Sequence, residues 1–143
     1  MEIQASCIHL GLQASDKEEA IRLTGKLLVE QGFVEHEYIN AMIQREKDLS
    51  TYMGNGIAIP HGTLKAKKLV KKTGIAVTQF PDGIPFDENE VAYIIFGIAA
   101  KDDEHLELLS QIAIFCKEEE NVEKLKHAKT IEEFISYLQE ADE

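Results

Sequence analysis

The sequence predicts an α/β domain: a small mixed β-sheet flanked by helices on both faces. Runs with apolar residues at helical spacing alternate along the chain with short runs rich in β-branched residues. Residues 91–100 contain almost no polar side chain, as expected for a central strand covered on both faces. No repeat, low-complexity tract or linker-like stretch interrupts the 143 residues, so we expect one domain over residues 1–143.

Two helices are expected before the first of the strands discussed below. The pattern Ser15-Asp16-Lys17-Glu18 is typical of a capping box, and the helical apolar spacing that follows ends at Gly32. The second helix, residues 35–48, carries Tyr38 and Arg45 along one apolar stripe. The charge on this stripe has two interpretations: Arg45 snorkels from the helix edge, or its guanidinium points into a site.

A short apolar strand, residues 57–59, ends abruptly at His61. Pro60 has no N–H for a ladder, and Gly62 can adopt φ values closed to other residues, so His61 is expected on a tight bend. An isolated histidine at such a place is most simply an ordinary loop residue. The bend becomes informative only through the residues around it.

The next segment, residues 64–72, is expected to be a helix capped by Thr63. Its N-terminus would bring free N–H groups close to His61, where they favour anions. The segment has no acidic residue and carries five lysines: Lys65, Lys67, Lys68, Lys71 and Lys72. These lysines either form a solvated helix face or steer a partner toward His61.

The second half of the chain is expected to add two strands and three helices. Residues 74–80 form a strand that stops at the turn signature Pro81-Asp82-Gly83, and the strand at 91–100 follows. The helices are expected to begin at Asp102 or Asp103, near Asn121, and at the capping box Thr130-Ile131-Glu132-Glu133. Because sites in such folds gather at the carboxyl ends of strands, His61 and His105 are both expected to reach one edge of the sheet.

Composition excludes several classes of function. With 26 acidic and 15 basic residues the net charge is -11, which argues against nonspecific binding to nucleic acid or anionic membranes and suits a basic protein partner. No apolar run reaches transmembrane length and no signal peptide is visible, so we expect a cytoplasmic protein. Cys7 and Cys116 are expected to be buried thiols, and the spacing of the cysteines and histidines favours no metal site.

The run from Arg45 through Thr51-Tyr52-Met53-Gly54 to Pro60-His61-Gly62-Thr63 closely resembles the mannitol-type enzyme IIA domain of the sugar phosphotransferase system. The similarity extends from Ser15 through residues 97–106 to the C-terminal helix. It implies that His61 is the histidine that accepts and donates a phosphoryl group. It also implies that His105 is a neutral hydrogen-bond partner and that Arg45 stabilises the phosphoryl group during transfer.

The chemistry of these residue types agrees with those implied roles. A neutral imidazole is a good nucleophile near neutral pH, and a planar guanidinium matches the oxygens of a transferring phosphoryl group. The first turn of a helix disfavours the imidazolium form of His105. Gly54-Asn55-Gly56 is neither a complete dinucleotide fingerprint nor a phosphate loop, and no cofactor is expected.

The resemblance also implies the partners. The phosphocarrier HPr would phosphorylate His61, which would then phosphorylate a cysteine on the EIIB domain of the mannitol transporter EIICB. The chain would be a free-standing phosphotransferase component that neither inserts into the membrane nor binds sugar or nucleic acid. Two alternatives stay open: a regulatory module like the nitrogen-type IIA proteins, and a fructose-type EIIA.

Overall fold

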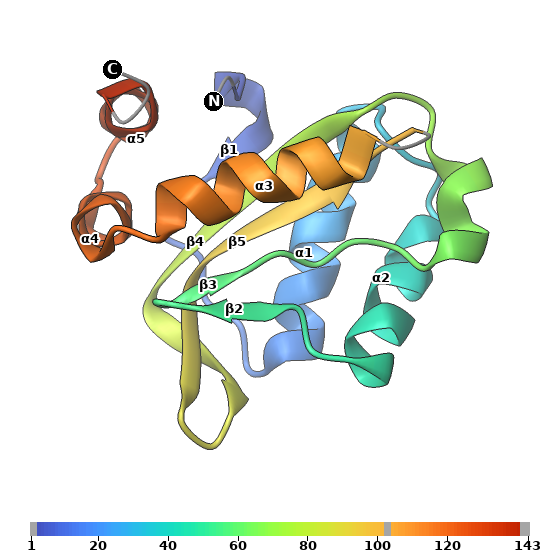
Figure 1. Ribbon diagram of the computed structural model, residues 1–143, viewed down its shortest axis with the longest axis horizontal. Helices are drawn as coiled ribbons and strands as arrows, with labels where there is room; N and C mark the ends of the chain where they lie inside the picture. The colour runs from blue at the N-terminus through green and yellow to red at the C-terminus, as the bar shows by residue number, and fades with distance from the viewer. Residues whose placement is uncertain (1–2, 102–103, 141–143) are drawn as a thin grey trace.

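The computed structural model describes residues 3–101 and 104–140, except for the side chain of His105 (Figure 1). One mixed sheet has the strand order β1-β4-β5-β3-β2. The strands are β1 (Ile8–His9), β2 (Tyr52–Gly54), β3 (Ile57–Ala58), β4 (Gly74–Asp87) and β5 (Glu90–Ala99). β1 is parallel to β4 and β3 is parallel to β5, while β4 with β5 and β2 with β3 are antiparallel. The apolar strand predicted at 91–100 is therefore central, as expected.

Helices cover both faces of the sheet, which confirms the predicted fold class. α1 (Lys17–Glu30) and α2 (Tyr38–Asp48) pack on one face together with the 3-10 segment η2 (Leu64–Leu69). The other face carries η1 (Ala5–Cys7), α3 (Glu104–Cys116), α4 (Glu119–His127) and α5 (Ile131–Glu140). Figure 1 shows α3 in front of β5 and α1 behind it.

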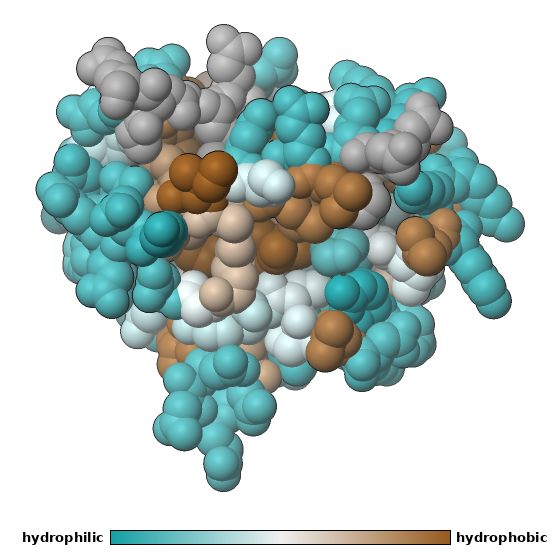
Figure 2. Space-filling view, in the orientation of Figure 1, coloured by the Kyte–Doolittle hydropathy of each residue, from teal (hydrophilic) through white to brown (hydrophobic). Residues whose placement is uncertain are grey.

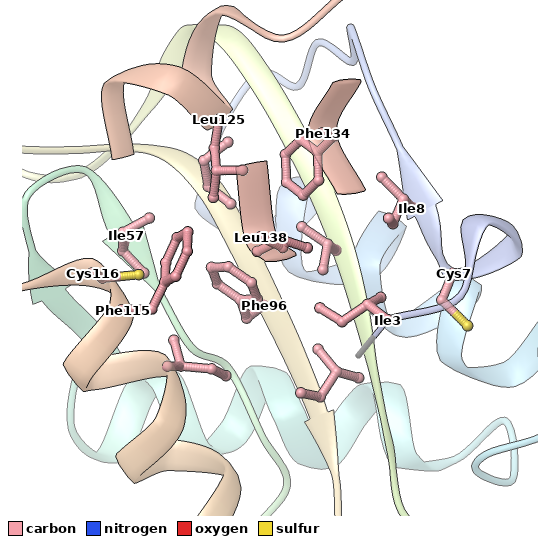
Figure 3. Close-up of a cluster of buried hydrophobic side chains, with 14 of the residues drawn as sticks. Ile3, Cys7, Ile8, Ile57, Phe96, Phe115, Cys116, Leu125, Phe134 and Leu138 are labelled. Carbon is pink, nitrogen blue, oxygen red and sulfur yellow. The ribbon is translucent and has the colours of Figure 1, made fainter. Parts of the chain in front are cut away.

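The larger cluster of buried side chains lies between the sheet and α3, α4 and α5. Phe96 of β5 lies among Phe115, Leu125, Phe134 and Leu138 (Figure 3). Burying an aliphatic or phenylalanine side chain contributes about 1.5–3 kcal/mol, so this face holds much of the stability of the fold. Both cysteines are free and buried, as predicted; Cys7 and Cys116 belong to this cluster.

The close packing of α1 on the sheet depends on a glycine. A Cβ atom at Gly97 of β5 would lie 2.6 Å from Cγ2 of Thr24. The two threonine hydroxyls of Thr24 and Thr78 are 2.8 Å apart and join α1 to β4 inside the core. A residue with any side chain at position 97 would push α1 away from this contact.

The helix ends follow the sequence signals with one change. Asp16, and not Ser15, is the N-cap of α1, because its carboxylate accepts the N–H of Glu19 at 2.9 Å. Gly32, at φ 78°, ends the helix as predicted. Its N–H donates to the carbonyl of Val29, and the N–H of Phe33 donates to the carbonyl of Leu28.

The other helices begin close to the predicted positions. α2 starts at Tyr38 rather than at residue 35, because Glu35 donates its N–H to the carbonyl of Leu69 and stays outside the helix. α4 starts at Glu119, two residues earlier than expected. The final capping box is half formed: Thr130 Oγ1 accepts the N–H of Glu133 at 3.1 Å, but the Glu133 carboxylate accepts the N–H of Lys129 and not that of Thr130. The predicted caps Asp102 and Asp103 lie outside the described residues.

Two predicted segments differ in the structure. β4 does not stop at Pro81-Asp82-Gly83 but continues to Asp87, with a register shift against β5 between Gln79 and Ile84. Residues 81–83 form a bulge in the strand. Phe80 and Ile84, on either side of these residues, are buried, and their burial keeps the chain before and after the bulge in the sheet. The helix expected at 64–72 is only the six-residue 3-10 segment η2.

The structure also contains a hairpin that the sequence reasoning omitted. β2 and β3 are joined by Asn55 and Gly56, whose φ angles are 52° and 81°. Positive φ at both central residues is typical of a type I′ turn, for which Asn-Gly is the preferred sequence. The hairpin matters for the site because β3 leads directly to His61.

Candidate functional site

His61 lies at the edge of a surface depression of about 610 Å³ beyond the carboxyl ends of β3 and β5. The depression is lined by residues of α2, of the bend after β3, of η2 and of the end of β5. His61 and Arg45 both belong to this lining, so the structure brings together two of the three predicted site residues. The strand-end position agrees with the expectation for an α/β sheet.

The bend fixes the backbone and the ring of His61. The Pro60 carbonyl accepts the N–H of Ile98 at 3.0 Å, and His61 forms a parallel bridge with Ile98. The ring Nδ1 is 2.9 Å from the carbonyl oxygen of Ile59. Because a carbonyl only accepts, Nδ1 carries the proton in this hydrogen bond, and a neutral ring then has its lone pair on Nε2.

Arg45 reaches the depression from the last turn of α2. Its side chain is half-buried, and Nη1 donates to the Leu49 carbonyl at 2.6 Å. That bond uses one of the five N–H donors of a guanidinium. Arg45 therefore lies at the depression, and its role as a ligand for a group bound there stays a prediction.

The segment after α2 is held by a buried carboxylate. Glu46 Oε1 accepts the N–H and the hydroxyl of Thr51 at 2.8 and 2.6 Å, and Oε2 accepts from Lys17 at 3.2 Å. Burial raises the pKa of Glu46, but hydrogen bonds from Thr51, Ser50 and Lys17 outweigh it, and the pKa lies below 4.5. Glu46 therefore remains charged at neutral pH and ties α2 to β2.

Tyr38 is the site residue that the sequence reasoning assigned only to an apolar stripe. Its side chain is 4% exposed and lines the depression. The hydroxyl donates to the carbonyl of Ile98 and accepts the N–H of Gly62, both at 2.8 Å. Burial raises the pKa of Tyr38, and the Gly62 N–H partly lowers it. A glycine directly after the histidine was the signal that something packs closely there.

The third predicted site residue, His105, lies in the first turn of α3. Its backbone follows β5 as expected, but its side chain is outside the described residues. Its predicted contact with His61 therefore remains a prediction.

The lysines of residues 64–72 do not form one helix face. Lys65 and Lys67 line the depression. Lys71 pairs with Glu35 at 3.6 Å, and Lys72 lies 5.0 Å from the ring centroid of Phe33. The expected helix N-terminus near His61 is wrong, because η2 is a short 3-10 segment and the Thr63 side chain makes no capping hydrogen bond among the described residues.

Apolar side chains are exposed around the site. Leu49 and Leu64, both in the lining, are 68% and 78% exposed. Figure 2 shows a further apolar surface that includes α3, where Leu106 and Ile114 are 61% and 73% exposed. Exposed leucines beside a histidine and an arginine suit a protein partner better than a small polar ligand.

The described part of the chain also holds two thiols and several side chains of the types that ligate metals. In residues 3–101 and 104–140, no three histidine, cysteine or acidic side chains are grouped to hold a metal ion. Burial raises the pKa of Cys116 to about 12 and also raises that of Cys7, so neither thiol is ionised at neutral pH. No helix within the described ranges is long and apolar enough to cross a membrane.

These features define a class: an α/β sandwich with a histidine and an arginine at the carboxyl edge of its sheet. The family model described as "Phosphoenolpyruvate-dependent sugar phosphotransferase system, EIIA 2" matches residues 1–141. The chain belongs to this family.

Individual relatives give the same assignment. The mannitol-specific phosphotransferase enzyme IIA component of Geobacillus stearothermophilus is 51% identical over 135 residues, which cover 94% of this chain and 93% of that protein. The crystal structure of IIA mannitol from Escherichia coli superposes with a TM-score of 0.91 at 41% identity, covering 96% of this chain and 99% of that one.

Two further structures bear on partners and on regulation. The complex of enzyme IIAMtl and phosphorylated enzyme IIBMtl from Escherichia coli matches with a TM-score of 0.92 at 40% identity, covering 97% of this chain and 98% of that chain. The nitrogen regulatory protein IIA-Ntr from Neisseria meningitidis matches with a TM-score of 0.81 at 27% identity, covering 95% of each chain.

Proposed function

We propose that this chain carries phosphoryl groups in a mannitol phosphotransferase system, accepting them from phospho-HPr on His61 and passing them to EIIB. The observation that carries the proposal is that His61, with its Nδ1 hydrogen-bonded to a carbonyl, shares one depression with Arg45. Family membership supports phosphoryl transfer as the chemistry. The names of the relatives support mannitol over fructose as the sugar.

The nucleophile in this proposal is Nε2 of His61. Its lone pair forms the bond to phosphorus while the bond from phosphorus to the donor histidine of HPr breaks. In the second step a cysteine thiolate of EIIB forms the new bond to phosphorus, and the bond to Nε2 breaks. The hydrogen bond of Nδ1 to Ile59 holds the ring in the required tautomer throughout.

Arg45 stabilises the charge that develops on the transferring group. In a loose phosphoryl-transfer transition state the charge is spread over the equatorial oxygens, which the planar guanidinium binds. An arginine in this role accelerates transfer by about 10³ to 10⁵ in other enzymes. In this proposal His105 is a second donor: a neutral ring, which the first turn of α3 favours, would donate one N–H to the same oxygens.

The partner surface surrounds the depression. Leu49 and Leu64 provide exposed apolar contact, and the net charge of -11 attracts a basic donor. The solved complex of a IIAMtl protein with phosphorylated IIBMtl supports EIIB as the acceptor. Because phosphoenolpyruvate is the source of the phosphoryl group in this proposal, we expect the reaction to take place in the cytoplasm.

The proposal is tested by incubating the purified chain with phosphoenolpyruvate, enzyme I and HPr, followed by intact mass spectrometry at mildly alkaline pH. We expect one added phosphoryl group in the wild type and none in His61→Ala. His127→Ala is the matched control, because His127 is exposed and contacts Glu123 instead of the depression. If the wild type gains nothing, or His61→Ala gains as much, the assignment of His61 is wrong.

The acceptor is tested with the phosphorylated chain. We expect rapid transfer to the EIIB domain of a mannitol transporter and slower transfer to a fructose-type EIIB domain. Phosphorylation by HPr with no onward transfer to either domain would instead support a regulatory module of the nitrogen type.

A further inference from the structure

Two tyrosine hydroxyls link the ends of residues 56–62, the segment that contains β3, to the central strand β5 through hydrogen bonds. The Tyr52 hydroxyl accepts the N–H of Gly56 at 3.1 Å and donates to the Val91 carbonyl at 3.2 Å. The Tyr38 hydroxyl accepts the N–H of Gly62 and donates to Ile98, both at 2.8 Å. The two arrangements use the same chemistry, but only that of Tyr38 lies next to His61.

The contact between Tyr38 and Gly62 leaves no space for a side chain. A Cβ atom at position 62 would lie 2.5 Å from Cε1 of Tyr38. The close approach brings the phenol ring against the peptide that follows His61. Because burial raises the pKa of Tyr38, the hydroxyl stays neutral and can donate one hydrogen bond while it accepts another.

The backbone of His61 is thereby fixed on both sides by one residue of β5. Ile98 donates its N–H to the Pro60 carbonyl at 3.0 Å, on the peptide before His61. The Ile98 carbonyl reaches the peptide after His61 through the Tyr38 hydroxyl. The orientation of the His61 ring, which is set by the 2.9 Å contact of Nδ1 with Ile59, depends on both peptides.

We propose that Tyr38 is a positioning residue for phosphoryl transfer: its hydroxyl holds the peptide after His61 so that the ring stays in the Nδ1–H tautomer and Nε2 meets the incoming phosphorus. This inference rests on the proposed phosphoryl transfer at His61. Tyr38 touches the histidine backbone and acts through it. A misplacement of about 1 Å costs about 100-fold in rate when reacting groups must be aligned, so loss of the hydroxyl is expected to slow transfer by roughly 10- to 100-fold.

The test compares Tyr38→Phe with Tyr52→Phe in the full chain. Each variant keeps the ring and removes a hydroxyl that links a glycine N–H to a β5 carbonyl. Tyr52 lies outside the lining of the depression. The rate of phosphorylation of the chain is measured against the concentration of phospho-HPr, which separates the maximal rate from the half-saturating concentration.

We expect Tyr38→Phe to lower the maximal rate by roughly tenfold or more with little change in half-saturation, because the partner surface is intact. Tyr52→Phe should transfer at the wild-type rate. The ¹⁵N signals of the His61 ring provide a second readout that needs no partner protein. They should show the Nδ1–H tautomer in the wild type and in Tyr52→Phe, and a mixture of tautomers in Tyr38→Phe.

Equal rates for the two variants would overturn the proposal, as would an unchanged His61 ring tautomer in Tyr38→Phe. If Tyr38→Phe does not fold, Gly62→Ala replaces it, because the added methyl displaces the Tyr38 ring; the same loss of rate and of tautomer preference is expected. A wild type that accepts no phosphoryl group would refute the proposed function, while the ring signals would still decide whether Tyr38 orients His61.

Discussion

Replacing Glu46 by glutamine tests whether the charge of this buried side chain holds α2 to β2. The residue is 5% exposed, and its Oε1 atom bonds twice to Thr51 while Oε2 bonds to Lys17. In Glu46→Gln the amide oxygen still accepts from Thr51, but an NH₂ group faces the ammonium of Lys17. The variant therefore loses one charge-assisted hydrogen bond and weakens two others.

The expected magnitude follows from these contacts. Hydrogen bonds to charged groups contribute about 1.5–3 kcal/mol to stability. The Lys17 side chain is 39% exposed, so solvent screening reduces its share. We expect Glu46→Gln to lose about 1–2 kcal/mol of unfolding free energy, or roughly 3–8 °C in Tm for a chain of this length.

The pH dependence gives the sharper test. Because the pKa of folded Glu46 lies below its ordinary value of 4.5, the charge-dependent stabilisation is full above that value. It is lost as the pH falls through the lower folded pKa, where the protonated carboxyl group resembles glutamine. Urea unfolding should therefore show a difference in unfolding free energy between wild type and variant at neutral pH, and this difference should vanish at acidic pH.

Glu123→Gln is the matched control. Its side chain is 58% exposed and pairs with Lys126 and His127 on the surface of α4. Such exposed pairs contribute little, so the expected change is below about 0.5 kcal/mol. Equal losses in the two variants, or a Glu46→Gln gap that persists in acid, would refute the role of the buried charge.

Two further predictions concern the core. Gly97→Ala places a methyl group 2.6 Å from Cγ2 of Thr24 and should lower the unfolding free energy, measured in urea, by about 1–3 kcal/mol. A loss of unfolding free energy under about 0.5 kcal/mol would show that α1 adjusts freely. Cys116, whose pKa burial raises to about 12, should resist alkylation by iodoacetamide at mildly alkaline pH until urea unfolds the chain. Labelling is followed by intact mass spectrometry. If the folded chain is labelled as fast as the unfolded chain, the burial of Cys116 is contradicted.

Local sequence signals were sufficient for the general fold and for part of the site. The apolar run at 91–100 identified the central strand because burial on both faces leaves no polar position. Pro60 located the bend at His61 because it restricts φ. The φ argument for Gly62 was wrong, because Gly62 is not among the glycines with positive φ; its missing side chain leaves space for the Tyr38 ring instead. The apolar stripe of α2 left the direction of Arg45 open, and only the family resemblance favoured the site; Arg45 does line the depression.

Contacts between distant segments account for what the sequence did not predict. The turn signature at residues 81–83 was overridden because Phe80 and Ile84 are buried on both sides of it and pairing with β5 resumes. The Tyr38 hydroxyl finds its partners only when α2 packs against the end of β5. The Asn55-Gly56 turn, by contrast, was a local signal that the sequence analysis overlooked.

The first and last described segments of the chain meet in one cluster. Ile3 and Leu138 lie in the core on the α3–α5 side, as Figure 3 shows, and no residue of η1, β1 or α5 lines the depression at His61. The described residues nearest both ends of the chain therefore lie apart from the lining of the depression. We expect protein tethered through a tag or linker at either end to stay competent in single-turnover and surface-binding experiments with HPr.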